Sequence, residues 1–245
     1  MIGQMIGLLR AECLKLKRTV IVLLIVSVPL MVFLLGVAVI ATGNSASDWP
    51  MLAASGAAIW SFFLLPMTAT ALTALVAQLE HGSRGWSYTL ALPLAKWTVF
   101  SAKALIVLFV MAVISVLVGA AIIGSGVFAG WIAPKQAMAG ELPIALMVGL
   151  MTKMWLAGLL VVSIQFAVAI RFESFAVPVV VGIGGTFVAI VATSAKIGLY
   201  FPWLMATNVL NSEPERAAQA IVMGSLGGIA LFALTIVWLS RRDWK

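Results

Sequence analysis

The chain has 245 residues, of which 63% are hydrophobic and only 9% are charged, and its net charge is +7. So few charged residues cannot cover the surface of a soluble globular domain. The single cysteine, Cys13, excludes an intrachain disulfide, and the single histidine, His81, excludes a histidine cluster that could bind a metal.

Six apolar runs are long enough to cross a membrane as helices. About 20 apolar residues span a hydrocarbon core about 30 Å thick, and continuous runs favour helices over the alternating strands of a barrel. The runs are Thr19–Ala41, Leu52–Ala77, Val99–Ile123, Met151–Ile170, Phe175–Ala195 and Ala217–Leu239. We therefore predict an all-α, polytopic membrane protein with six transmembrane helices and a single transmembrane domain over residues 1–245.

Lysine and arginine residues are distributed unevenly between the two predicted sides of the membrane. Eleven of the fifteen lie on the side of the two termini, and the other side has Lys135, Lys153, Lys196 and Arg216. Basic residues concentrate on the cytoplasmic side of membrane proteins, so we predict that both termini are cytoplasmic. The positive charge then reflects orientation and affinity for anionic lipid headgroups, and it requires no nucleic-acid partner.

Residues 1–18 carry apolar side chains at helical spacing, with basic residues between them. This pattern predicts an amphipathic helix that lies in the headgroup plane before the first span. The alternative is a plain basic segment that precedes the span, and the residues leave both open. Glu12 is unusual because it is an acidic residue within this basic arm.

The second run contains Pro66 near its middle, followed by several threonines. A proline there frees a backbone carbonyl and kinks the helix, and nearby hydroxyls can bond to the freed group. Pro66 is thus a candidate helix hinge or a wall of a substrate path. The alternative is a kink that serves packing only.

A polar, basic segment that contains tryptophan and tyrosine, Gln78–Lys103, separates the second and third runs. Glu80 lies at the C-terminal end of the second predicted helix, where a carboxylate is unfavourable by about 0.3–1 kcal/mol. We therefore expect a cation beside it, and Arg84 four residues on is the natural partner if the helix continues that far. Lys103 is expected to anchor the third span at the membrane interface.

The same segment predicts a short amphipathic helix over about residues 83–90. It is either a docking site for a second protein or an ordinary cytoplasmic loop with an exposed ion pair. In the last predicted loop, the aromatic residues of Tyr200–Trp203 are typical of the outer membrane interface.

Several kinds of chemistry are missing from the sequence. It has no G-x-x-x-x-G-K-[ST] loop for ATP, no metal-ligand spacing and no nucleophile elbow. No carboxylate pair lies in the middle of a predicted span, where an ion-coupled carrier would need one. An enzyme and a self-powered transporter are therefore both disfavoured.

Three local patterns carry a resemblance to a known family. They are LLRAECLKLKRT at Leu8–Thr19, LEHGSRGWSYTLALPLAKW at Leu79–Trp97 followed by SAK at Ser101–Lys103, and YFPW at Tyr200–Trp203. With the six-span layout, they resemble the permease subunit of type-2 ABC exporters. The branch associated with lantibiotic immunity and bacitracin-type peptide antibiotic export is the most similar.

The resemblance implies that the N-terminal arm is an interfacial connector helix and that the loop after the second span contains a coupling helix. Glu80, Arg84, Trp86 and Tyr88 would then dock a separate nucleotide-binding ATPase subunit, and Glu12 would be an additional cytoplasmic contact. ATP and Mg would bind that partner, and this chain would bind no cofactor. A second permease, identical or paralogous, would complete the transporter.

The implied function is ATP-driven export or expulsion of an antimicrobial, lantibiotic-like peptide for self-protection, in a prokaryotic plasma membrane. The short predicted external loops differ from relatives with large extracytoplasmic domains, which argues against polysaccharide or large-protein cargo. Two alternatives remain open at this point. One is a membrane scaffold or sensor that recruits a cytoplasmic partner, and the other is an ABC permease for a different cargo such as a lipid or haem.

Overall fold

The computed structural model describes residues 2–17, 19–42, 48–82, 85–91, 93–138 and 140–242, and this part of the chain is all-α. The α-helices are α1 (Ile2–Leu16), α2 (Val20–Thr42), α3 (Trp49–Ile59), α4 (Leu65–His81), α5 (Gly85–Ala91), α6 (Lys96–Ile132), α7 (Ile144–Arg171), α8 (Ala176–Ala192), α9 (Met205–Asn208) and α10 (Pro214–Arg241). A π-helical segment, η1 (Trp60–Leu64), joins α3 to α4, and 3₁₀ turns are η2 (Pro134–Gln136), η3 (Lys196–Tyr200) and η4 (Pro202–Leu204).

Within the described residues, five helical segments are long and apolar enough to cross a membrane: α2, the continuous α3–η1–α4 segment, α6, α7 and α10. The all-α prediction and the prediction of a multi-pass membrane protein agree with this. The sixth predicted run forms α8, an apolar helix of 17 residues. Six spanning helices remain a prediction, because α8 falls short of the length that the other five reach.

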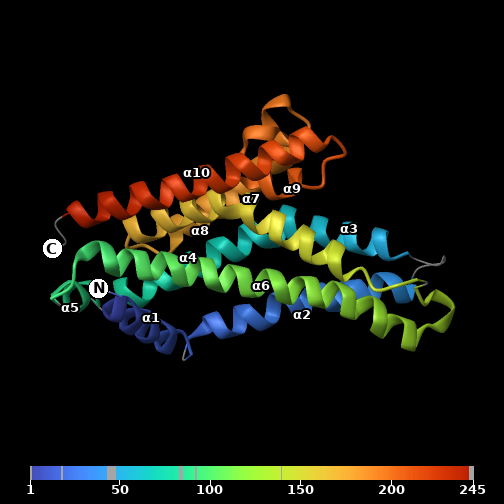
Figure 1. Cartoon of the computed structure of the whole chain (residues 1–245), viewed down its shortest axis with the longest axis horizontal. Helices are drawn as coiled ribbons and strands as arrows, with labels where there is room; N and C mark the ends of the chain where they lie inside the picture. Colours follow the sequence, from blue (N-terminus) through green and yellow to red (C-terminus); the bar gives the residue numbers. More distant parts are fainter. Residues whose placement is uncertain are drawn as a thin grey trace.

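The long helices lie side by side along one axis of the molecule (Figure 1). Figure 1 places α1, α5 and the end of α10 at the same end of this bundle. A hydrogen bond supports the placement of α10, because the Lys96 ammonium at the start of α6 donates to the Arg242 carbonyl at 3.2 Å. The turn η2 and the start of α3 lie at the opposite end.

The second span changes its helical winding just before Pro66. In η1 the N–H of Leu65 bonds to the carbonyl of Trp60, a five-residue step in place of the usual four. Pro66 follows one residue later and has no N–H to continue the helical pattern. The π-turn is thus the local form of the disturbance that the proline predicted, and the role of Pro66 as a hinge stays a prediction.

The residues after α8 turn back into the bundle. The backbone of Gly198 lies so close to the carbonyl of Ala192 that a Cβ there would overlap it, which permits a tight turn at the end of α8. Trp203 is 7% exposed and packs on Gly185 of α8, stacked against Phe201 at 5.5 Å between ring centroids. The expectation of an interfacial aromatic group is therefore wrong for Trp203, because its ring packs against protein.

A buried glutamine joins α8 to its neighbours. Gln165 of α7 is fully buried. In the amide orientation that gives both of its polar atoms a partner, it donates to the carbonyl of Pro178 at 3.2 Å and accepts from the N–H of Gly182 at 3.1 Å. Because polar groups in a membrane interior need partners, this amide fixes the position of the short helix against α7.

Helices α7 and α10 approach until their backbones touch. A Cβ at Gly224 would overlap the carbonyl oxygen of Ala157, and one at Gly228 would overlap the backbone of Leu159. Small residues at four-residue spacing permit this close approach between membrane helices. Gly227 lies on the same helix, but a Cβ there would meet only the Leu160 side chain at 3.5 Å, which is an ordinary contact.

We predict that Gly224→Ala destabilises the protein and that Gly227→Ala does not. The methyl group at Gly224 would force α10 away from the α7 backbone, and overpacking of this kind costs about 1–3 kcal/mol. Thermal unfolding of the two variants in the same detergent measures the difference. Equal transition temperatures would contradict the close backbone contact between α7 and α10.

Candidate functional site

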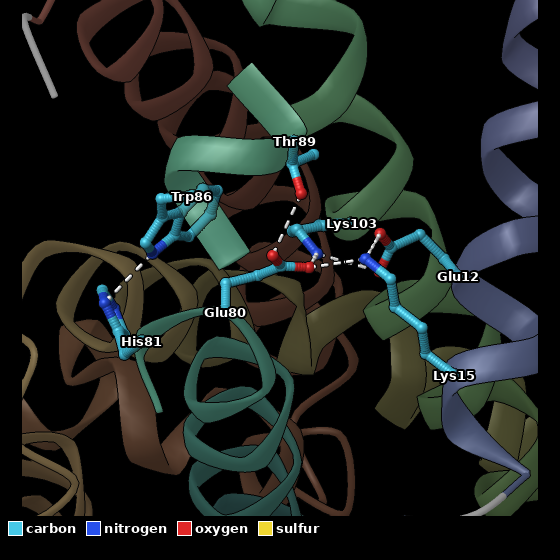
Figure 2. A network of polar contacts seen from close by, with 7 residues as sticks. All are labelled: Glu12, Lys15, Glu80, His81, Trp86, Thr89 and Lys103. Carbon is cyan, nitrogen blue, oxygen red and sulfur yellow. Dashed lines mark hydrogen bonds and ion pairs between the residues drawn. The ribbon is translucent and has the colours of Figure 1, made fainter. Parts of the chain in front are cut away.

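Four charged side chains form a closed ring at the end of the bundle where α5 lies (Figure 2). The ammonium group of Lys103 lies 2.9 Å from Glu12 Oε2 and 2.8 Å from Glu80 Oε1. That of Lys15 lies 3.0 Å from Glu12 Oε1 and 2.6 Å from Glu80 Oε1. Each cation therefore contacts both carboxylates, and the ring has no net charge.

Three of the four side chains in the ring are buried. Lys103 is fully buried and Glu80 and Glu12 are 2% and 3% exposed, while the side chain of Lys15 is 38% exposed. Charges removed from water persist only when they are paired and hydrogen-bonded. The ring satisfies this condition with residues from α1, α4 and α6, so it holds these three elements in one arrangement.

The pKa of Lys15 is raised from its ordinary value. Burial alone lowers it, but the hydrogen bonds to Glu80 and Glu12 and the charges of both carboxylates together outweigh burial. A raised folded-state pKa means that the contribution of Lys15 to stability is complete below the unfolded-state pKa. It is lost only as the pH rises through the folded-state value, far on the alkaline side.

Helix α5 is joined to the ring by a hydroxyl and an indole. Thr89 donates to Glu80 Oε2 at 3.2 Å, on the carboxylate oxygen that the two lysines leave open. Trp86 is 8% exposed, and the Lys103 ammonium lies 5.6 Å from its ring centroid. Trp86 also packs on Phe100 of α6 at 5.4 Å between ring centroids. These contacts hold a helix of seven residues that could not persist by itself.

A second link to α5 runs through His81, the last residue of α4. The indole N–H of Trp86 donates to His81 Nδ1 at 3.0 Å. The other ring nitrogen, Nε2, lies 3.2 Å from the carbonyl oxygen of Ala169 near the end of α7. The imidazole therefore lies between α5 and α7, and Figure 2 shows its ring facing Trp86.

The structure brings together part of the residue set that the sequence singled out. Glu80, Trp86 and Glu12 lie in one cluster, and Glu80 has the cationic partners that its position at a helix end predicted. Arg84 lies outside the described residues, and of Tyr88 only the backbone in α5 is described. Glu80 and Glu12 are committed to contacts within the chain and expose almost no surface of their own, and Glu80 accepts a hydrogen bond from Thr89 of α5.

Sequence reasoning missed the two lysines that complete the ring. The expectation that Lys103 anchors the third span at the interface is wrong, because its side chain is fully buried against two carboxylates. One signal was available: Lys103 falls inside an apolar run, and an ionisable residue there predicts a buried partner. The predicted helix over about residues 83–90 corresponds to α5 at Gly85–Ala91 within the described residues.

The arrangement offers mechanical support. In the part of the chain that is described, no group of three or more metal-ligating side chains occurs. A cavity of about 300 Å³ between α6 and α7 has an apolar lining, and the Ser115 hydroxyl in that lining donates to the Met111 carbonyl at 2.8 Å. The polar cluster around Glu80 is closely packed, with every carboxylate oxygen bonded.

Comparison with known proteins gave one family match. Residues 8–190 match the model of a family described as ABC-2 family transporter protein, which covers α1 through most of α8. No curated protein and no solved structure was found to match the chain. The match includes all the residues of the charged ring and of α5.

We predict that Lys103→Met destabilises the protein by about 3–5 kcal/mol, because it leaves two buried carboxylates with one cation. Adding Glu12→Gln to this variant restores the charge balance between Glu80 and Lys15, and we expect it to recover more than half of the loss. Lys15→Met should destabilise less, since Lys15 is partly solvated. Thermal unfolding in one detergent measures all three. A double variant no more stable than Lys103→Met would contradict charge balance as the cause.

Proposed function

The chain belongs to the ABC-2 transporter family and is a membrane permease with no ATPase site of its own, and we propose that it exports or expels a lantibiotic-like antimicrobial peptide for self-protection. An ABC-2 permease implies a separate ATPase subunit, which binds and hydrolyses the ATP. The observation that carries the coupling part of this proposal is the buried ring that fastens α5 to the ends of two long helices.

In this proposal α5 is the coupling helix, and the ATPase subunit docks on its outer surface. Arg84 and Tyr88 supply direct contacts. Glu80, Glu12 and Trp86 hold α5 in position, since their side chains are buried among α1, α4, α5 and α6. A rigid fastening supports this role, because a displacement of α5 is then passed to α4 and α6 without being absorbed by a flexible loop.

The proposed mechanism is a population shift between two states of the permease. ATP closes the nucleotide-binding subunits, α5 moves with them, and the transport path opens on the opposite side of the membrane. The π-turn η1 and Pro66 lie within the span that ends at His81, and a change of helix direction is least resisted at such a turn. We propose this point as the hinge.

The proposed topology has six crossings, with both termini in the cytoplasm of a prokaryotic cell. The location of α1, α5 and the end of α10 at one end of the bundle supports an even number of crossings. Helix α8 would be the sixth, with the residues after it folded back into the bundle. A second permease, identical or paralogous, would complete the transport path.

The cargo is proposed from the sequence patterns and from the size of the outer segments. Between α6 and α7 the chain has only residues 133–143, and between α8 and α10 only 193–213. Segments of this length cannot form a large external domain, which favours a small amphiphilic cargo. A lipid or haem as cargo, and a scaffold or sensor that does not transport, are the alternatives.

We predict that Arg84→Ala/Tyr88→Ala lowers recovery of the ATPase subunit at least tenfold when the tagged permease is purified from its native membrane in mild detergent. Tenfold corresponds to about 1.4 kcal/mol, a modest loss for two contacts. The control is Arg216→Ala/Tyr200→Ala, which removes the same residue types at the opposite end of the bundle. Quantitative mass spectrometry measures the recovered subunit. Equal recovery from both variants would move the docking site away from α5.

We predict that a purified lantibiotic raises the ATPase activity of the reconstituted complex in liposomes at least twofold. A scaffold has no reason to respond to cargo, and a lipid or haem transporter would respond to its own cargo instead. Parallel measurements with haem and with added phospholipid therefore separate the alternatives. A complex that hydrolyses ATP but ignores the lantibiotic would leave the permease function intact and overturn the cargo.

A further inference from the structure

His81 has a polar partner on each of its ring nitrogens, and these partners belong to different elements. Trp86 of α5 lies on the Nδ1 side, at 3.0 Å, and the Ala169 carbonyl of α7 lies on the Nε2 side, at 3.2 Å. The two rings meet edge to face, with centroids 5.7 Å apart. No other histidine occurs in the chain.

The partners determine which nitrogen has the proton. The Trp86 indole N–H can only donate, so Nδ1 must accept and must be unprotonated. The Ala169 carbonyl can only accept, so Nε2 must have the hydrogen. The geometry thus requires the neutral imidazole with its proton on Nε2. A protonated ring would present a second N–H to the indole N–H, and the link to α5 would be lost.

We propose that His81 is a positioning residue that joins α5 to α7 through its neutral Nε2–H form, and that protonation of this ring releases α5. Histidine is the side chain whose ordinary titration falls between pH 5 and 8. His81 is half-buried, so part of the residue is exposed. The expected effect of this release on binding of the ATPase subunit rests on the proposed function, because it requires that α5 carries the ATPase contact. The release of α5 itself does not.

The charged residues around the His81 imidazole do not oppose this assignment. Glu80 is adjacent in sequence, but its carboxylate is occupied by Lys15, Lys103 and Thr89. Helix α5 itself has no charged side chain, and Arg84 before it lies outside the described residues. The charged side chains on α1, α4, α6 and α7, and on the turn after α7, are Arg10, Glu12, Lys15, Glu80, Lys96, Lys103, Lys153, Arg171 and Glu173.

The first experiment reads the tautomer directly. Because the sequence has one histidine, ¹⁵N-histidine labelling of a Strep-tagged protein in nanodiscs reports on His81 alone. We expect the nitrogen chemical shifts at pH 7.5 to show an unprotonated Nδ1 and a protonated Nε2. Trp86→Phe should remove this preference and give a mixture of tautomers. A protonated Nδ1 in the wild-type protein at pH 7.5 overturns the proposal.

The second experiment measures the release of α5. Amide hydrogen exchange in the peptide that contains α5, corrected for intrinsic rates, should rise about 2- to 10-fold from pH 7.5 to pH 5.5, the range expected for loss of one hydrogen bond. His81→Asn keeps an acceptor near Nδ1 and does not titrate, so its exchange should not change with pH. A wild-type protein whose α5 exchange stays constant while the NMR signals show His81 protonated overturns the proposal.

Purification of the ATPase subunit with the permease at both pH values separates this inference from the proposed function. We expect recovery to fall at pH 5.5 for the wild type and to stay constant for His81→Asn. If amide exchange in α5 responds to pH in the wild type but ATPase recovery does not, the link of α5 to α7 through His81 stands and the docking role of α5 fails. If neither amide exchange nor ATPase recovery responds although His81 is protonated, the proposed link through His81 itself fails.

Discussion

The requirement that buried charge be neutralised determines how this end of the bundle is built. Glu12 and Lys103 are separated by 91 residues in the chain, yet their side chains are buried against each other at 2.9 Å. Each carboxylate of the ring touches both lysines, so the loss of any one member would leave an uncompensated charge in a medium that solvates it poorly. The position of α1 against α6 and the direction in which α4 ends both follow from this closed ring.

Helix α5 is held by two fastenings that respond to different conditions. The link through Thr89 and Glu80 belongs to the charged ring, whose lysine Lys15 loses its charge only at strongly alkaline pH. The link through Trp86 and His81 depends on a neutral imidazole. Protonation of the imidazole therefore acts on one link and leaves the other in place, so that α5 is released at one side while it remains attached at the other.

The sequence was sufficient to predict the helices and to predict that Glu80 has a cationic partner. It was not sufficient to identify Lys15 and Lys103 as the partners of Glu80. Long apolar runs make helices because a membrane leaves the backbone no alternative, and a carboxylate at a helix end requires a cation. Which cation it meets depends on how α1 and α6 pack in space, and no local spacing encodes that. The end of α8 at Ala192 could not be predicted from the sequence either, because the apolar run continues to Ala195. The helix ends where Gly198 and Trp203 turn back to contact it.

The backbone contact of Gly224 and Gly228 with α7 has a mechanical consequence. Two helices separated by side chains can slide, since rotamers adjust as the surfaces shift, but helices whose main chains touch have nothing between them that can rearrange. Helices α7 and α10 therefore form one stiff unit where Gly224 and Gly228 meet the α7 backbone. We therefore expect a transport path to open beside α7 and α10 and not between them.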